Sequence, residues 1–132
     1  MLGTVVRVRV EVPRGGRVKR GPTGAVELVS PVGCPFDYGA IPALHAADGD
    51  PADAVILGPP RRAGEDALLV VHGVVHFRDR GIADDKWVCG DVPTEAEKRR
   101  ILRFFRWYAR LKTLRRPWRP SAVLGTTWHE RP

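Results

Sequence analysis

The sequence predicts an α+β domain, mainly β, in which a run of short strands precedes one long helix. Three observations predict it: valines alternate with charged residues near the N-terminus, short apolar runs follow between glycines and prolines, and a helical period begins after residue 93. This order of elements suggests a small antiparallel barrel or sheet covered by the helix. The 132 residues are enough for one domain, over 1–132, with its own hydrophobic core.

The predicted strands are short and are bounded by turn residues. Residues 4–12 place valines on one face and charged side chains on the other, which is typical of a half-buried strand. Further strands are predicted from apolar runs at 25–29, 54–58, 67–77 and 86–89. Residues 30–42 are rich in proline and glycine, and we expect a loop with fixed bends there.

One long helix is predicted after Pro93. Thr94 and Glu97 have the spacing of a capping box, which marks the start of a helix. Apolar side chains then recur at helical spacing to about residue 113, at Ile101, Phe104, Phe105, Tyr108 and Leu111. An irregular tail is expected from Arg115 onward, because no period is visible there.

The chain is strongly basic, with 22 Lys and Arg against 15 Asp and Glu and a net charge of +7. Such an excess favours an anionic partner, such as a phosphorylated ligand, nucleic acid or an acidic membrane. No apolar run is long enough to span a membrane, and the alternating N-terminus is not a signal peptide. Two cysteines are too few for a disulfide framework, so a cytoplasmic location is expected.

The acidic residues gather in two short loops beside apolar strands. The first loop is Asp-Gly-Asp-Pro-Ala-Asp at 48–53, and the second runs from Asp79 to Lys86. Crowded carboxylates repel one another unless a cation compensates, and hard oxygen ligands suit Mg²⁺ or Mn²⁺. An EF-hand is excluded because Ala52 stands where a third ligand is required. A solvated turn explains either loop taken alone, so the spacing of the carboxylates does not decide between a metal site and a solvated turn.

Five blocks of sequence resemble soluble family I inorganic pyrophosphatases. They are Val-Glu-Val-Pro at 10–13 with Lys19, Pro-Phe-Asp-Tyr-Gly-Ala-Ile-Pro at 35–42, the acidic loop at 48–53, the D-x4-D-x-K loop at 79–86, and Phe-Phe-Arg-Trp-Tyr at 104–108. The blocks follow the family's order over roughly residues 5–112. The resemblance implies a divergent, shortened member with a small OB-like β-barrel. It also implies Mg²⁺-dependent hydrolysis of pyrophosphate to two phosphates.

The resemblance implies a role for each matching side chain. Asp50 would be the general base, and Tyr38 would orient the nucleophile or contact phosphate. The metal ligands would be Asp48, Asp53, Asp79 and Asp84, with Glu11 supporting the metals through water. Phosphate oxygens would be bound by Lys19, Lys86 and Tyr108.

The chain departs from the family pattern at several substrate-binding positions. Gly21 and Ala109 replace a glutamate and a lysine, Cys34 replaces a tyrosine, and no arginine occurs in residues 25–30. Another cation could compensate by reaching inward, and the candidates are Arg17, Arg20, Arg78, Arg110 and Lys112. Arg20 and Arg110 are the better candidates, because each adjoins a position where the family has a catalytic group.

Other interpretations stay open at this point. Tyr108 could serve only as core packing, and Glu11 could pair with Arg7 or Arg9 across the strand surface. The enlarged site could take a nucleotide instead of pyrophosphate. A non-catalytic, OB-like module for nucleic acid is a third reading, but the acidic loops would repel a phosphate backbone, so nucleic acid is not the expected partner. The sequence leaves a homo-oligomer open.

Overall fold

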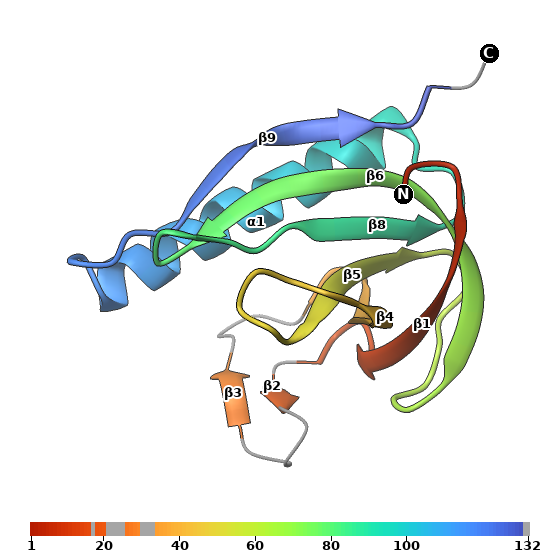
Figure 1. Cartoon of the computed structure of the whole chain (residues 1–132), viewed down its shortest axis with the longest axis horizontal. Coiled ribbons are helices and arrows are strands. Elements are labelled where there is room, and N and C mark those ends of the chain that lie inside the picture. Colours follow the sequence, from red (N-terminus) through yellow and green to blue (C-terminus); the bar gives the residue numbers. More distant parts are fainter. Residues whose placement is uncertain (17, 21–25, 30–33, 131–132) are drawn as a thin grey trace.

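The computed structural model describes residues 1–16, 18–20, 26–29 and 34–130, and within them five strands close into a barrel. Their order around the barrel is β1 (Val5–Val12), β4 (Asp37–His45), β5 (Pro51–Leu57), β8 (Lys86–Gly90) and β6 (Asp66–Asp79), which pairs again with β1. Figure 1 shows this closure. The predicted fold class is confirmed, with one difference: β5 and β8 run parallel, whereas the other barrel pairs are antiparallel.

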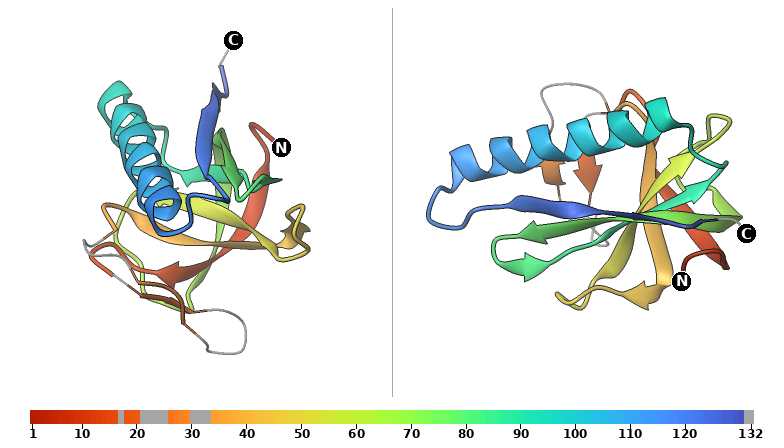
Figure 2. Two further views of the ribbon diagram at one scale, coloured as in Figure 1. Left: turned by 90° about the vertical axis from the view of Figure 1, so that its left-hand side faces the viewer. Right: turned by 90° about the horizontal axis from the view of Figure 1, so that it is seen from above.

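The remaining described elements surround the barrel. The short β7 (Ile82–Ala83) and β9 (Ala122–Trp128) both pair with β6. A hairpin of β2 (Val18–Arg20) and β3 (Val26–Val29) forms a separate small sheet. Helix α1 (Glu95–Arg115) lies along one side of the barrel, next to β9, and the hairpin lies away from it (Figure 2).

The expectation of a loop over 30–42 is wrong from residue 37 onward, because β4 begins at Asp37. The glycine and proline that suggest a loop have specific tasks in this strand. A Cβ on Gly39 would lie 2.0 Å from the carbonyl oxygen of Arg9, so glycine permits the close approach of β1. Pro42 lies where the register between β4 and β5 shifts, and a missing N–H is tolerated at such an irregularity.

The expectation of an irregular C-terminal tail is also wrong, because β9 adds an edge strand to β6. The pattern was hidden by Gly125, which has a φ of 145° and sits where the register with β6 shifts. This bulge interrupts the alternation of side chains that would identify a strand in the sequence.

The helix begins as its sequence predicts. The side chain of Thr94 accepts a hydrogen bond from the Glu97 N–H at 3.1 Å, and the Glu97 carboxylate accepts one from the Thr94 N–H at 3.0 Å. This capping box satisfies donors that the first helical turn leaves open. No helix within the described ranges is long and apolar enough to cross a membrane.

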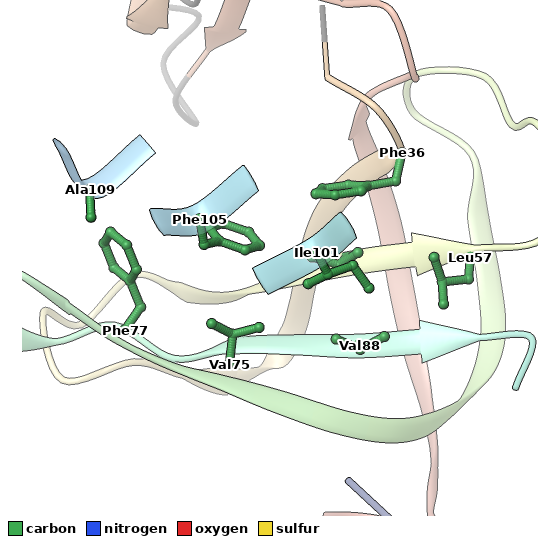
Figure 3. Close-up of a cluster of buried hydrophobic side chains, with 9 residues drawn as sticks. Phe36, Leu57, Val75, Phe77, Val88, Ile101, Phe105 and Ala109 are labelled. Carbon is green, nitrogen blue, oxygen red and sulfur yellow. The ribbon is translucent and has the colours of Figure 1, made fainter. Parts of the chain in front are cut away.

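Two hydrophobic clusters hold the helix and the barrel together. The cluster between α1 and the barrel is shown in Figure 3 and contains Phe36, Leu57, Val75, Phe77, Val88, Ile101, Phe105 and Ala109. The cluster inside the barrel contains Val8, Val10, Ile41, Ala54, Ile56, Leu69, Val71 and Cys89. Because β5 contributes side chains to both clusters, it is buried on both faces, which explains its continuous apolar sequence.

Both cysteines are expected to resist thiol reagents in the folded protein. Burial raises the pKa of Cys34 to about 11, with the Asp37 charge adding to it, and burial raises the pKa of Cys89 to about 12. Because the thiolate is the reactive form, neither thiol reacts quickly at pH 8. An Ellman assay should show both thiols reacting promptly in urea and neither in native buffer. One rapidly reacting native thiol would contradict this expectation.

Candidate functional site

Acidic and basic side chains meet where β5 and β8 begin and β6 ends. The parallel pairing of β5 with β8 sets Asp53 beside Lys86 in register. The turn after β6 returns the chain so that the Asp84 N–H donates to the Phe77 carbonyl at 2.8 Å. Carboxylates that are distant in the sequence are therefore brought to one end of the barrel.

Lys86 lies at the centre of this group. Its ammonium donates to Asp53 at 2.6 Å and to Asp84 at 2.9 Å, and it lies 5.2 Å from the centre of the Phe77 ring. The residue is only 3% exposed. Burial opposes its charge, but the charges and hydrogen bonds of the two carboxylates outweigh burial and raise the pKa of Lys86. The ammonium is therefore present across the physiological range.

Asp84 and Asp53 share this one positive charge, and the pKa of Asp84 reflects it. Burial raises the pKa of Asp84, and although Lys86 opposes this, the negative charges of Asp53 and Asp79 add to the rise. The group therefore carries more negative than positive charge at its centre. Such a surplus of carboxylate oxygen is the chemistry that a divalent cation satisfies.

Tyr38 adds a hydroxyl to the group from β4. Its hydroxyl donates a hydrogen bond to Asp53, and its ring packs near Phe105. Burial, together with the charges of Asp53 and Asp84, raises the pKa of Tyr38 well above its ordinary value. The phenol therefore keeps its proton and acts as a donor. Glu11 lies at the irregularity between β1 and β4, opposite Tyr38 and Gly39.

Asp79 lies at the end of β6 and has protein donors on both oxygens. Oδ2 accepts from the Lys112 ammonium at 2.7 Å, and Oδ1 accepts from the Ser121 hydroxyl at 2.9 Å. Burial opposes the charge of Asp79, but Lys112, Ser121 and the nearby Arg80 hold the pKa of this carboxyl below its usual value. Asp79 is therefore ionised at neutral pH.

Tyr108 connects the helix to both lysines. Its ring stacks on Phe77 with a centroid distance of 5.8 Å, and the Lys112 ammonium lies 5.1 Å from the centre of the Tyr108 ring. Lys86 lies over the other ring of this pair, that of Phe77. Core packing is thus one task of Tyr108, as its place in the helical pattern suggested, and it lies beside the charged group at the same time.

Asp48 and Asp50 lie on the exposed turn before β5. The Asp50 N–H donates to the Asp48 carboxylate at 3.0 Å, and the Ala46 N–H donates to the Asp50 carbonyl at 2.8 Å. Gly49 between them has a φ of 87°, which suits glycine. This folded turn sets the positions of Asp48 and Asp50 relative to Asp53, and it leaves Asp50 exposed to solvent.

The structure does not bring every predicted residue to this group. Arg110 is exposed on α1, four residues from the exposed Arg106 and away from the buried face of Phe105 and Ala109. Lys19 and Arg20 are placed in β2, but their side chains, and Gly21, lie outside the described residues. Among the candidate compensating cations whose side chains the structure describes, Lys112 pairs with a predicted metal ligand, Asp79.

Sequence reasoning ranked Lys112 below Arg110 and missed Ser121. A signal for Lys112 was available, since it follows Tyr108 by four residues and therefore lies on the same side of the helix. Ser121 carries no such signal, because its position depends on contacts between the end of α1 and the start of β9. Thr113 makes those contacts, accepting from the Ser121 N–H at 3.0 Å and donating to the Ala109 carbonyl at 2.9 Å.

The donor chemistry of the group fits a hard divalent cation. Its oxygens come from Asp53, Asp84 and Asp79, with Asp48 on the adjoining turn. Within the described ranges no three acidic, histidine or cysteine side chains stand together in the arrangement of a metal site. Instead, the Lys86 ammonium lies between Asp53 and Asp84, and the Lys112 ammonium pairs with Asp79.

Known proteins are similar to this chain in sequence and architecture. The sequence model of the inorganic pyrophosphatase family matches residues 8–127. An inorganic pyrophosphatase of Thermus thermophilus is 33% identical and aligns with 96% of this chain and 82% of its own. One of Gluconobacter oxydans is 30% identical over 81% of this chain and 75% of its own. The crystal structure of the Thermus thermophilus enzyme superposes with a TM-score of 0.76 at 29% identity, covering 94% of this chain and 82% of that one.

Proposed function

The chain belongs to the inorganic pyrophosphatase family of enzymes, and we propose that it hydrolyses pyrophosphate to two phosphates with Mg²⁺ as its cofactor. The observation that carries this proposal is the buried Lys86 ammonium between Asp53 and Asp84, with Tyr38 donating to Asp53. A buried surplus of carboxylates destabilises a fold. Such a group is therefore evidence for a functional site, and a cation-dependent reaction of an anionic substrate accounts for it.

Four aspartates of the two acidic loops would hold the metal ions. We assign Asp48, Asp53 and Asp84 as direct ligands of the metal ions. Asp79 would bind a metal ion that Asp84 also binds, and Glu11 would support the metal ions through water. When bound, Mg²⁺ lowers the pKa of the attacking water and screens the charge of the phosphates. The protein contributes a strand pair, β5 and β8, that fixes Asp53 beside Lys86, and Lys86 in turn bonds to Asp84.

Asp50 is the general base in this proposal. Its exposed carboxylate takes a proton from the attacking water, the water oxygen bonds to phosphorus, and the bridging P–O bond breaks to release the second phosphate. Tyr38 keeps its proton and orients the oxygen atoms by donation. Lys86, Lys19 and Tyr108 contact phosphate oxygens, and the ammonium of Lys86 favours the charge that develops on the leaving group.

The direct test is phosphate release from pyrophosphate by the full chain. We expect release with Mg²⁺, none after EDTA, and recovery when Mg²⁺ is added in excess of EDTA. ATP in place of pyrophosphate gives the matched substrate control, and we expect slower release from it. Release that ignores EDTA would overturn the metal requirement, and faster release from ATP would reassign the substrate.

A further inference from the structure

The Lys112–Asp79 pair lies at the edge of the proposed metal site and is held in place from three elements. Lys112 comes from the last turn of α1, Asp79 from the end of β6, and Ser121 from the residue before β9. Thr113 binds the Ser121 backbone and so fixes the serine hydroxyl on Asp79. The carboxylate is therefore aligned by contacts that do not depend on any bound ion.

The two oxygens of Asp79 differ in what occupies them. Oδ1 accepts from the Ser121 hydroxyl, whose residue is 8% exposed, and it lies 3.8 Å from the Arg80 guanidinium nitrogen, so the hydrogen-bond donor on this oxygen is a neutral and fixed part of the structure. Lys112 on Oδ2 is a charged donor on a flexible stem, and its side chain is 26% exposed. An ammonium that solvent can reach leaves its carboxylate more readily than one enclosed like Lys86, whose side chain is 4% exposed.

The Lys112 ammonium also lies beside the aromatic pair that contacts Lys86. It lies over the ring of Tyr108, which stacks on Phe77, and Phe77 carries the ammonium of Lys86 on its own ring. The stacked pair thus has one lysine associated with each ring. An anion bound at Lys86 would also attract the positive charge of Lys112, because the two ammoniums lie over the two rings of one stacked pair.

We propose that Lys112 competes with a divalent cation for Asp79 and releases this carboxylate when an anionic substrate arrives. The inference rests on the proposed function, because it takes Asp79 as a metal ligand. In the substrate-free protein the ammonium neutralises Asp79, so a cation binds there weakly. With substrate present, the ammonium moves to the phosphate oxygens and Oδ2 becomes available to a metal ion.

The test measures Mn²⁺ binding without substrate, by the electron paramagnetic resonance signal of free Mn²⁺. Lys112→Met removes the charge and keeps the length of the side chain. We expect this variant to bind one Mn²⁺ about tenfold more tightly than the wild type, because the competing charge is gone. Lys112→Arg, which keeps the charge, should behave like the wild type. Lys98→Met is the matched control on the same helix, since Lys98 pairs with Glu95 at 3.1 Å, and it should change nothing.

Two further measurements assign the effect to Asp79. Asp79→Asn in the Lys112→Met background should remove the gained affinity. Methylenediphosphonate, which cannot be hydrolysed at its bridging carbon, should raise the Mn²⁺ affinity of the wild type towards that of Lys112→Met. Unchanged or weaker Mn²⁺ binding by Lys112→Met would overturn the inference, and Lys112→Gln repeats the test if that variant does not fold. This test measures binding and no turnover, so its result can be interpreted even if the chain releases no phosphate in the pyrophosphatase assay.

Discussion

Asp50→Ala is expected to lower Mg²⁺-dependent phosphate release by about 10²–10⁴-fold, the usual contribution of a general base. The loss should fall on kcat, because Asp50 accepts its proton only as the water attacks. Stability should change little, since the side chain is exposed and the turn is held by the Asp50 backbone and the Asp48 carboxylate. Initial rates over a range of pyrophosphate concentrations, with a thermal melt for each protein, provide the measurement.

Asp91→Ala is the matched control for this experiment. Asp91 is also an exposed aspartate beside a barrel strand, but it follows the end of β8, whereas the acidic group lies where β8 begins. Its rate should stay within about twofold of the wild type. Equal losses in the two variants, or an Asp50→Ala rate near that of the wild type, would remove Asp50 from the mechanism.

Lys86→Met is expected to destabilise the metal-free protein by about 3–5 kcal/mol at pH 7.5, the cost of leaving buried charge without its partner. Asp53 and Asp84, now without the ammonium, would repel each other in a poorly solvated position. Urea unfolding in EDTA, compared with Lys98→Met, measures the difference. The exposed Lys98–Glu95 pair should contribute at most about 1 kcal/mol.

The pH dependence of this variant has a definite sign. The pKa of Lys86 is raised in the folded wild type above its ordinary value of 10.5, so the ammonium itself stays charged between pH 7.5 and pH 5, and only the carboxyls can change the gap there. In Lys86→Met the carboxyl pKa values rise, so protonation on acidification removes the repulsion. The gap between variant and wild type should therefore narrow from pH 7.5 to pH 5. A gap below 1 kcal/mol at pH 7.5, or one that widens on acidification, would contradict this account.

Much of the architecture could be predicted because local signals and burial agree. The alternation in β1 corresponds to buried Val8, Val10 and Val12, and the capping box starts α1 at Glu95. The continuous apolar run in β5 indicated a buried strand but not its partner. Its parallel pairing with β8 depends on contacts across more than thirty residues, which periodicity does not report.

The strands that were missed carry residues whose task is visible only in three dimensions. Gly39 and Gly125 look like breakers in the sequence, yet one allows two backbones to approach and the other forms a bulge. The residues of the site also divide into those that sequence patterns identify and those that only the fold identifies. The acidic loops could be recognised from sequence, but the preference for Lys112 over Arg110 depends on which helical face meets β6.

The length of β6 has a consequence for how the site is acquired during folding. This strand pairs with β1, β7, β8 and β9, and the ladder that closes the barrel joins Val5 to Val70. Contacts at such separation form late, because the loop-closure entropy must be overcome first. Since Asp79 ends this strand and Asp84 follows its turn, a chain arrested before closure lacks the assembled acidic group. Phosphate release during refolding would therefore report barrel closure itself, with no separate probe attached.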